Sequence, residues 1–344
     1  MPERLALACL VLVLAGPVSA GSLEEREKGD YGTTYWGRFQ NAPFPVPGSE
    51  YKDNTIAVFV PRHFCPVLMR VSQKSGKGRR TARFECYDSS RFDALRKTKG
   101  TRVERVTRVD YVVHFHGHSN TVAKALNNHK LREQFSLSLQ NAILVVPQGP
   151  VNAIDSAAGK LESKGGFARM MNEVHAFLQK QGVVGRKQRI GRIVVTSHSG
   201  GYRAAAMSIT LGGIEVSEVF LFDSLYSHTD KFFEWISKGG KKGRRFVSVF
   251  FREKPVERNK ELMQMLKKAG VRYASLKESE MSKPDFQRKR LARENVIFIH
   301  TDQGHSECTR GNFNYRDYLF ASRLRRVRST DWFQKTGLDK LKVH

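Results

Sequence analysis

The sequence predicts an α/β protein: a mostly parallel central sheet of about eight strands, with helices on both faces. Apolar segments rich in Val, Ile and Phe recur along the chain without polar alternation, which is typical of strands buried on both faces. Segments with helical periodicity lie between them. Because a strand followed by a helix normally returns to pair in parallel with a neighbour, this alternation favours a parallel sheet covered on both sides.

The strand pattern is found in apolar segments of five or six residues. They are Thr55–Val60, Tyr111–Phe115, Ala142–Val146, Arg192–Thr196, Glu218–Phe222, Phe246–Phe251 and Val296–His300. Two further segments, Pro66–Val71 and Arg83–Tyr87, flank a basic loop and are expected to form a hairpin.

The clearest helix carries apolar residues at steps of three and four, which places them on one stripe. These residues are Phe167, Met170, Met171, Val174, Phe177 and Leu178. Helical patterns also cover Gly200–Leu211, Asp230–Ser237, Glu257–Ala269 and Asn314–Leu324.

Residues 1–20 have the layout of a secretory signal peptide. Arg4 precedes the apolar run Leu5–Ala15, and the small residues of Val18–Ala20 form a cleavage site. This predicts a secreted or periplasmic protein, and no other segment is long and apolar enough for a transmembrane span. Residues 21–50, rich in Gly, Pro and aromatics, are interpreted as an irregular arm, and residues 51–344 as a single domain.

Export would leave three cysteines in an oxidising compartment. Cys65 and Cys86 flank the basic loop and are the expected disulfide pair, which leaves Cys308 over. Three unpaired, buried thiols are the alternative.

The formal net charge is +26. Basic runs lie at Lys74–Arg80, Lys238–Arg245 and Arg323–Arg328, and we interpret each alone as a solvated loop or helix face. Together they would attract an anionic surface or polymer. Because no base-reading module accompanies the charge, no sequence-specific binding of nucleic acid is expected.

The segment Ile193–Ala206 (IVVTSHSGGYRAAA) runs from a buried strand into a helix rich in small residues, through the turn Ser197–Gly201. Upstream, His116 and Gly117 follow the strand Tyr111–Phe115. Downstream, His305 lies in the loop after the last apolar strand segment.

These motifs and their order resemble the α/β-hydrolase superfamily, over roughly residues 55–325. The turn resembles the nucleophile elbow G-x-S-x-G, with Ser197 in place of the first glycine. The resemblance implies Ser199 as nucleophile and His305 as base. It also implies an oxyanion hole formed by backbone amides of Gly117 or His118 and of Gly200.

The resemblance further implies an acid between nucleophile and base in the chain. We favour Asp223, which directly follows a buried strand. Glu253 follows the next strand and is the alternative, with Asp302 third. Tyr202 and His116, which adjoin the motifs, are expected to contact the substrate.

The predicted function is hydrolysis of a carboxylic ester through an acyl-enzyme on Ser199, without a cofactor or metal. The substrate is a small-molecule or polymer ester or amide. Three alternatives remain open: an amidase or peptidase acting on cell-envelope material, a non-catalytic basic module that binds anionic polymers, and a metallohydrolase. The last would use His114, His116 and His118, which share one strand face.

Overall fold

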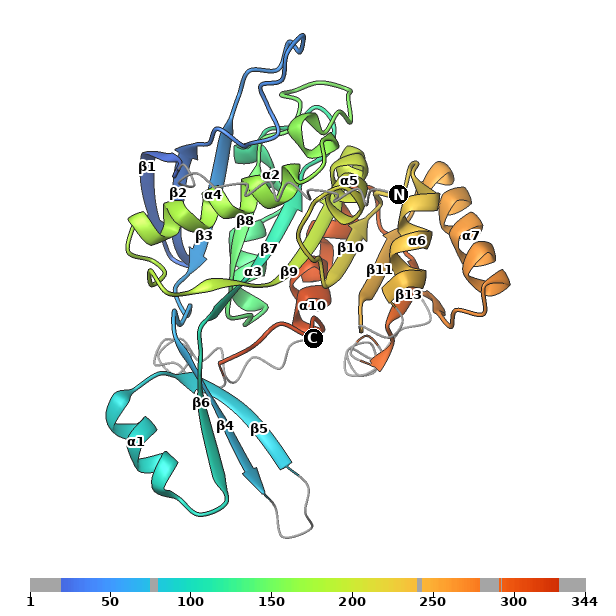
Figure 1. Cartoon of the computed structure of the whole chain (residues 1–344). Coiled ribbons are helices and arrows are strands. Elements are labelled where there is room, and N and C mark those ends of the chain that lie inside the picture. The colour runs from blue at the N-terminus through green and yellow to red at the C-terminus, as the bar shows by residue number, and fades with distance from the viewer. Residues whose placement is uncertain (1–19, 75–79, 240–242, 279–290, 292, 328–344) are drawn as a thin grey trace, which may run out of the picture.

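A ten-stranded mixed sheet forms the centre of the computed structural model, which describes residues 20–74, 80–239, 243–278, 291 and 293–327 (Figure 1). Across the sheet the strands are β1 (Ser22–Gly29), β2 (Gly32–Arg38), β3 (Thr55–Pro61), β8 (Ala142–Pro147), β7 (Arg108–Phe115), β9 (Arg189–His198), β10 (Glu218–Phe222), β11 (Arg245–Phe250), β13 (Val296–His300) and β12 (Ala274–Lys277). The seven strands from β8 to β12 in this spatial order are parallel to one another, and β1, β2 and β3 pair in antiparallel fashion. The prediction of an α/β protein with a mostly parallel sheet is therefore confirmed.

The interpretation of residues 21–50 as an irregular arm is wrong for its first part. β1 and β2 form an antiparallel hairpin that extends the sheet beyond the predicted eight strands. Every residue of β1 is exposed, so no apolar face holds this strand in place. It is held by backbone pairing with β2 and by ion pairs of Glu24 with Arg38 and of Glu27 with Arg132. The other strand missed in this sheet, β12, has only four residues and carries no long apolar run.

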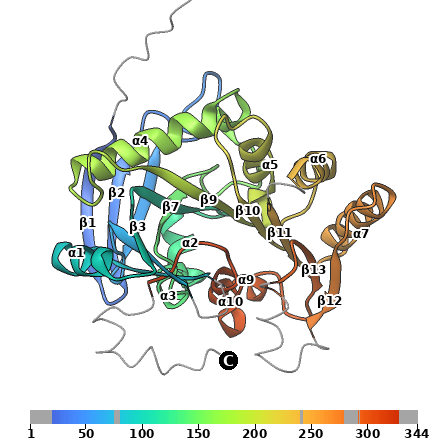
Figure 2. The same cartoon turned by 60° about the horizontal axis from the view of Figure 1, so that its bottom comes forward.

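Helices cover both faces of the sheet, as expected (Figure 2). α4 (Gly166–Lys180), α5 (Tyr202–Thr210), α6 (Thr229–Gly239) and α7 (Glu253–Lys268) pack in one apolar cluster, and α2 (Val122–Asn128), α3 (Leu131–Leu137) and α10 (Asn314–Phe320) in the other. Along β9, Val195 belongs to the first cluster and Val194 to the second, because successive side chains point to opposite faces. None of the described helices is long and apolar enough to cross a bilayer.

A second, small sheet projects from the main one (Figure 1). It contains β5 (Arg80–Cys86), β4 (Leu68–Lys74) and β6 (Thr101–Val106), and α1 (Ser89–Lys97) lies beside it. The predicted hairpin is present as β4 and β5, while residues 75–79 of the basic loop lie outside the described residues. This sheet lies between β3 and β7 in the chain. It therefore leaves the main sheet at the amino-terminal ends of the parallel strands.

The expected disulfide joins Cys65 to Cys86, and Cys308 is buried and unpaired in the described part of the chain. The disulfide links the end of β5 to the segment that enters β4. It thus closes the base of the small sheet.

The interpretation of two basic runs as solvated is wrong for some of their arginines. Arg245 is fully buried, and its guanidinium donates to the carbonyl oxygens of Ala321 and Leu291. Arg325 is mostly buried and forms an ion pair with Asp110, whose side chain is fully buried. Residues 240–242 and Arg328 lie outside the described residues.

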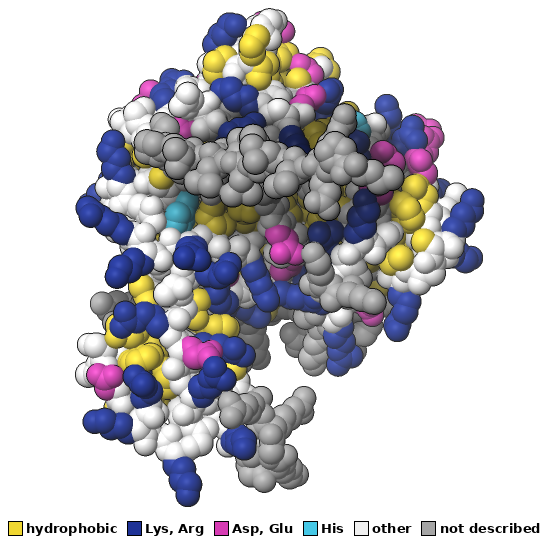
Figure 3. All heavy atoms as spheres, in the orientation of Figure 1, with side chains coloured by type: hydrophobic (Ala, Val, Ile, Leu, Met, Phe, Trp, Pro, Cys, Tyr) yellow, Lys and Arg dark blue, Asp and Glu magenta, His cyan; other side chains and the backbone are white. Residues whose placement is uncertain are grey.

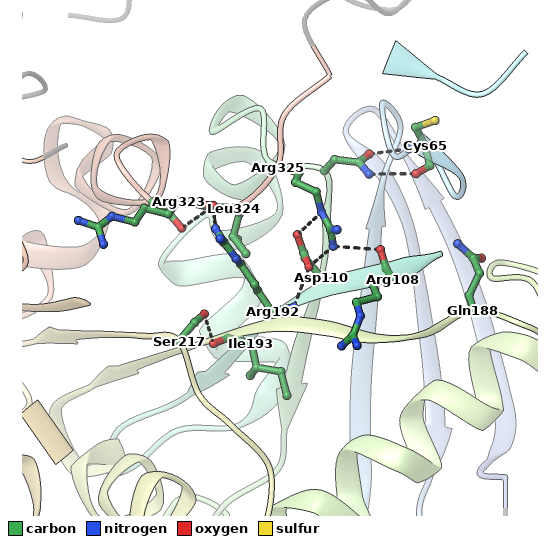
Figure 4. Close-up of polar contacts among 12 residues, drawn as sticks. Cys65, Arg108, Asp110, Gln188, Arg192, Ile193, Ser217, Arg323, Leu324 and Arg325 are labelled. Atoms are coloured by element: carbon green, nitrogen blue, oxygen red, sulfur yellow. Dashed lines mark hydrogen bonds and ion pairs between the residues drawn. The ribbon is translucent and has the colours of Figure 1, made fainter. Parts of the chain in front are cut away.

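Figure 4 shows how the segment around Arg325 crosses the amino-terminal ends of the parallel strands. Arg325 Nε donates to Asp110 Oδ2 at 2.9 Å, and the Arg325 guanidinium also donates to the Arg108 carbonyl at 3.0 Å. Asp110 Oδ1 accepts from the Arg192 amide at 2.7 Å. The Asn141 amide donates to the Arg325 carbonyl at 2.7 Å. One buried carboxylate therefore connects the C-terminal segment to β7 and β9.

Replacing Arg325 with Met is expected to lower the free energy of unfolding by about 3 kcal/mol, because it leaves the buried Asp110 carboxylate without its cation. Urea denaturation at neutral pH measures this loss. Arg186→Met, at an exposed position, is the control and is expected to change stability by less than about 0.5 kcal/mol. Equal effects of the two substitutions would contradict a structural role for the ion pair.

Candidate functional site

The predicted site residues gather at the carboxyl ends of β7, β9, β10 and β13. A cavity of about 360 Å³ opens there. It is lined by His118, Ser119, Asn120, Lys124, Asn128, His129, His198, Ser199, His305, Ser306 and Arg310. Ser199 and His305, which are far apart in the sequence, therefore face the same cavity.

The chain turns sharply at Ser199, between β9 and α5. Ser199 has φ +50°, a left-handed conformation that is uncommon for a residue with a side chain. Ser224 Oγ donates to the Ser199 carbonyl at 2.8 Å, and Ser197 Oγ lies 2.8 Å from Ser224 Oγ. These contacts connect the bend to the end of β10 and hold it in this conformation.

Three glycines allow the bend to lie close to the loop after β7. A Cβ atom at Gly117 would lie 2.7 Å from the Cβ of Ser199, and one at Gly201 would lie 2.5 Å from the Phe115 carbonyl oxygen. A Cβ at Gly200 would overlap the imidazole of His118, 2.1 Å from its Cδ2. The small residues of both motifs are thus explained by contact between them.

His305 and Asp223 form a hydrogen bond of 2.5 Å between Nδ1 and Oδ2. The Asp223 side chain is fully buried, and its Oδ1 accepts from the amides of Phe251 at 2.9 Å and Arg252 at 3.2 Å. Because a carboxylate only accepts, Nδ1 donates this hydrogen bond, so the neutral form of the imidazole has its lone pair on Nε2. This is the tautomer that a general base requires.

The two other acidic candidates lie elsewhere. Glu253 lies in the first turn of α7, since this helix begins four residues before the predicted start, and its side chain is exposed. Asp302 is exposed in the loop after β13. Within the described residues, Asp223 is the carboxylate that contacts His305.

The structure brings Gly117, His118 and Gly200 together, as expected for an oxyanion hole. The Gly200 amide lies at the start of a helical segment, where the first N–H groups have no partner within the helix. His118 is positioned through its Nε2, which lies 2.7 Å from Ser156 Oγ. The Ser119 amide donates to the Ala153 carbonyl, so it is already used.

His116 connects two loops. Its Nε2 accepts from the Gly149 amide and from the Gln148 side chain, each at 2.9 Å, so its proton lies on Nδ1 and is donated to the Gly117 carbonyl at 2.9 Å. Both ring nitrogens are therefore used inside the protein. This arrangement favours a positioning role for His116 instead of the predicted polar contact with substrate.

Tyr202, the other expected substrate contact, does not line the cavity at Ser199. Its ring lies 6.0 Å from the ring of Tyr226 and 6.0 Å from that of His228. The arginine that follows it, Arg203, forms an ion pair of 2.7 Å with Glu162.

The metallohydrolase alternative is contradicted by the geometry of its three histidines. His114 Nδ1 lies 2.9 Å from Thr196 Oγ1, His118 Nε2 contacts Ser156, and neither nitrogen of His116 is available. In the described part of the chain, no group of three or more His, Cys, Asp or Glu side chains is arranged to hold a metal ion.

A row of imidazoles next to His305 was not predicted from the sequence. The ring of His198 lies between those of His305 and His129, at centroid distances of 4.6 and 4.5 Å. His198 Nε2 donates to the His305 carbonyl at 3.0 Å. His198 lies inside the elbow motif, but His129 follows α2, a helix that the apolar pattern did not predict.

Burial, together with the charges of Arg310 and His305, lowers the pKa of His129 to about 4. Burial also lowers the pKa of His198 and His114 well below the usual value, and neighbouring imidazoles contribute. These rings are therefore neutral at physiological pH.

No family model and no curated protein matches the chain. Among solved structures, it is similar to a ferulic acid esterase (11% identity, 89% of this chain and 99% of that one, TM-score 0.45). It is also similar to an S-formylglutathione hydrolase from Agrobacterium tumefaciens (11% identity, 88% and 99%, TM-score 0.43). A third is a fluorophosphonate-binding serine hydrolase of Staphylococcus aureus (8% identity, 88% and 100%, TM-score 0.41).

The protein is expected to lose stability as the pH falls from 6.5 toward 4. The folded-state pKa values of the buried histidines, among them His63 and His129 at about 4, lie below the value of about 6.5 for an unfolded chain. The unfolded state therefore binds more protons in this window, and each such histidine contributes a slope of about 1.4 kcal/mol per pH unit.

Urea denaturation at pH 7.5 and pH 5.0 measures this dependence, with a lower free energy of unfolding expected at pH 5.0. His63→Gln is expected to reduce the difference, since it removes one of the protonated groups from the unfolded state. A stability that is constant or rises on acidification would show that the imidazoles are not neutral in the folded protein.

Proposed function

We propose that the chain is a serine hydrolase that cleaves a carboxylic ester through an acyl-enzyme on Ser199. The main support is the hydrogen bond from His305 to the buried Asp223, at the edge of the cavity that Ser199 also lines. A nucleophile, a base with its lone pair on Nε2, and an orienting carboxylate are the three groups that acyl transfer requires.

In the proposed reaction, Ser199 Oγ attacks the ester carbonyl carbon and His305 Nε2 takes its proton. The backbone amides of Gly200 and of His118 or Gly117 stabilise the oxyanion of the tetrahedral intermediate. His305 then gives the proton to the leaving alkoxide, the C–O bond breaks, and the acyl group remains on Ser199. Water, activated by the same imidazole, releases the carboxylic acid.

Asp223 would act through His305. Its carboxylate holds the imidazole in the required tautomer and stabilises the positive charge that forms on it in the transition state. Because the Asp223 side chain is fully buried, this attraction is screened less than it would be in water.

The proposed location is outside the cytoplasm, secreted or periplasmic, with residues 1–20 as a cleaved signal peptide. Those residues lie almost entirely outside the described part of the chain. The disulfide between Cys65 and Cys86 supports this proposal, because disulfides persist in oxidising compartments.

A second proposed activity, binding to an anionic surface or polymer, is supported by the charge of the small sheet. Residues 68–106 contain twelve lysines and arginines and four acidic residues. Lys and Arg side chains spread over this part of the surface (Figure 3). The small sheet lies at the amino-terminal ends of the parallel strands, whereas Ser199 lies at their carboxyl ends. Such binding would therefore leave the cavity accessible.

Wild-type protein is expected to hydrolyse small 4-nitrophenyl esters faster than the matching anilides, and Ser199→Ala is expected to lower kcat by about 10⁶, to the limit of detection. Initial rates over an ester and amide panel measure both effects. Faster cleavage of anilides would indicate the amidase alternative. Ester hydrolysis that survives Ser199→Ala with unchanged kcat would exclude Ser199 as nucleophile.

Asp223→Asn is expected to lower kcat by about 10⁴, because an amide can stabilise the wrong tautomer of His305. Glu253→Gln is the matched control at the alternative acid, and it is expected to keep wild-type kcat. The reverse result, a large loss of kcat with Glu253→Gln alone, would identify Glu253 as the acid of the triad.

A further inference from the structure

We propose that the cavity beside Ser199 selects esters that carry an anionic group, a carboxylate or phosphate, which Lys124 binds. This inference rests on the proposed function and adds the substrate class. It depends on which charges line the cavity and on which of them are already neutralised.

The lining of the cavity is polar and carries positive charge. Besides the histidines and Ser199, it contains Lys124 and Arg310, the amide side chains of Asn120 and Asn128, and two serine hydroxyls. None of these described lining residues is Asp or Glu. A volume of about 360 Å³ lies within the range of about 300–1,000 Å³ found for small-molecule sites.

In the described part of the chain, Lys124 forms no ion pair with a carboxylate. Its ammonium donates to Asn152 Oδ1 at 2.9 Å, and this acceptor is neutral. Two of its three N–H donors remain for a ligand. An anion in the cavity would therefore gain both a charge-assisted hydrogen bond and the full charge of the ammonium.

Arg310 is a weaker candidate for the same role. Its guanidinium pairs with Glu307, with Nε 2.6 Å from Oε1, so much of its charge is compensated. It still contributes to the field in the cavity, since it lowers the pKa of His129. We therefore assign the direct contact to Lys124 and a supporting effect to Arg310.

Both cations lie on the segments that carry the proposed reacting groups. Lys124 is on α2, which follows the loop of Gly117 and His118, and Arg310 ends α9 (Glu307–Arg310), which follows His305. Short stretches of chain therefore connect these cations to the groups that we propose take part in the reaction. An anionic group a few bonds from the scissile carbonyl would reach this side of the cavity.

The test compares two esters of similar size, 4-nitrophenyl hemiglutarate and 4-nitrophenyl valerate, of which the first carries a carboxylate. We expect wild-type kcat/KM to be at least about tenfold higher for the anionic ester, and Lys124→Gln to lower the ratio of the two kcat/KM values about tenfold, mainly through KM. Because Lys124 is exposed, raising the salt concentration is expected to weaken the preference.

The control is Lys180→Gln, which removes an exposed charge from the last turn of α4, away from the cavity lining. It is expected to keep the wild-type ratio, which separates a local contact from the general attraction of a chain with net charge +26.

A second pair of esters places the carboxylate on the alcohol side of the scissile bond: 4-carboxyphenyl valerate is compared with phenyl valerate. A preference for the anionic ester of either pair supports the inference.

No preference for either anionic ester, or the same loss of preference with Lys124→Gln and Lys180→Gln, would overturn the inference. Hydrolysis of the neutral esters that depends on Ser199 would then still support the proposed function. Failure of the proposed function has a different signature, since no ester of either kind would be hydrolysed in a Ser199-dependent way.

Discussion

The left-handed bend at Ser199 is the constraint on which the site depends. A residue with a side chain adopts this conformation only when its surroundings hold it there. Here Ser224 holds the carbonyl of the bend, and Gly117 and Gly201 let the neighbouring strand and loop approach within van der Waals contact. The same close approach places the loop that carries the His118 amide beside Gly200. Bend and proposed oxyanion hole are thus consequences of one packing arrangement.

The carboxyl ends and the amino ends of the parallel strands are organised differently. At the carboxyl ends, fixed backbone groups and neutral imidazoles surround a cavity with uncompensated positive charge. At the amino ends, the buried carboxylate of Asp110 pairs with Arg325 and connects the C-terminal segment to two strands (Figure 4). Part of the high arginine content therefore stabilises the fold, and the rest lies on the surface of the small sheet and at the cavity. Net charge alone does not distinguish these roles.

The sequence predicted those parts of the molecule whose physical cause is local. Strands buried on both faces leave continuous apolar runs, so the sequence predicted the parallel strands β7, β8, β9, β10, β11 and β13. The small residues of the elbow placed the bend at Ser199. The edge strand β1 was missed because its residues are all exposed, so it carries no apolar pattern, and the contacts that hold it are made with residues elsewhere in the chain. The pairing of Arg325 with Asp110 joins residues 215 positions apart. The role of His116 likewise depends on contacts with Gly149, from another loop, that no local pattern encodes.

Covalent labelling with a fluorophosphonate, followed by peptide mass spectrometry to locate the adduct, tests directly whether Ser199 is an activated nucleophile. A hydroxyl reacts with this reagent when a neighbouring base activates it. We expect one adduct per chain, on Ser199, and much slower labelling after Asp223→Asn. A protein that stays unlabelled, or that carries the adduct on another residue, would contradict the assignment of Ser199 as an activated nucleophile.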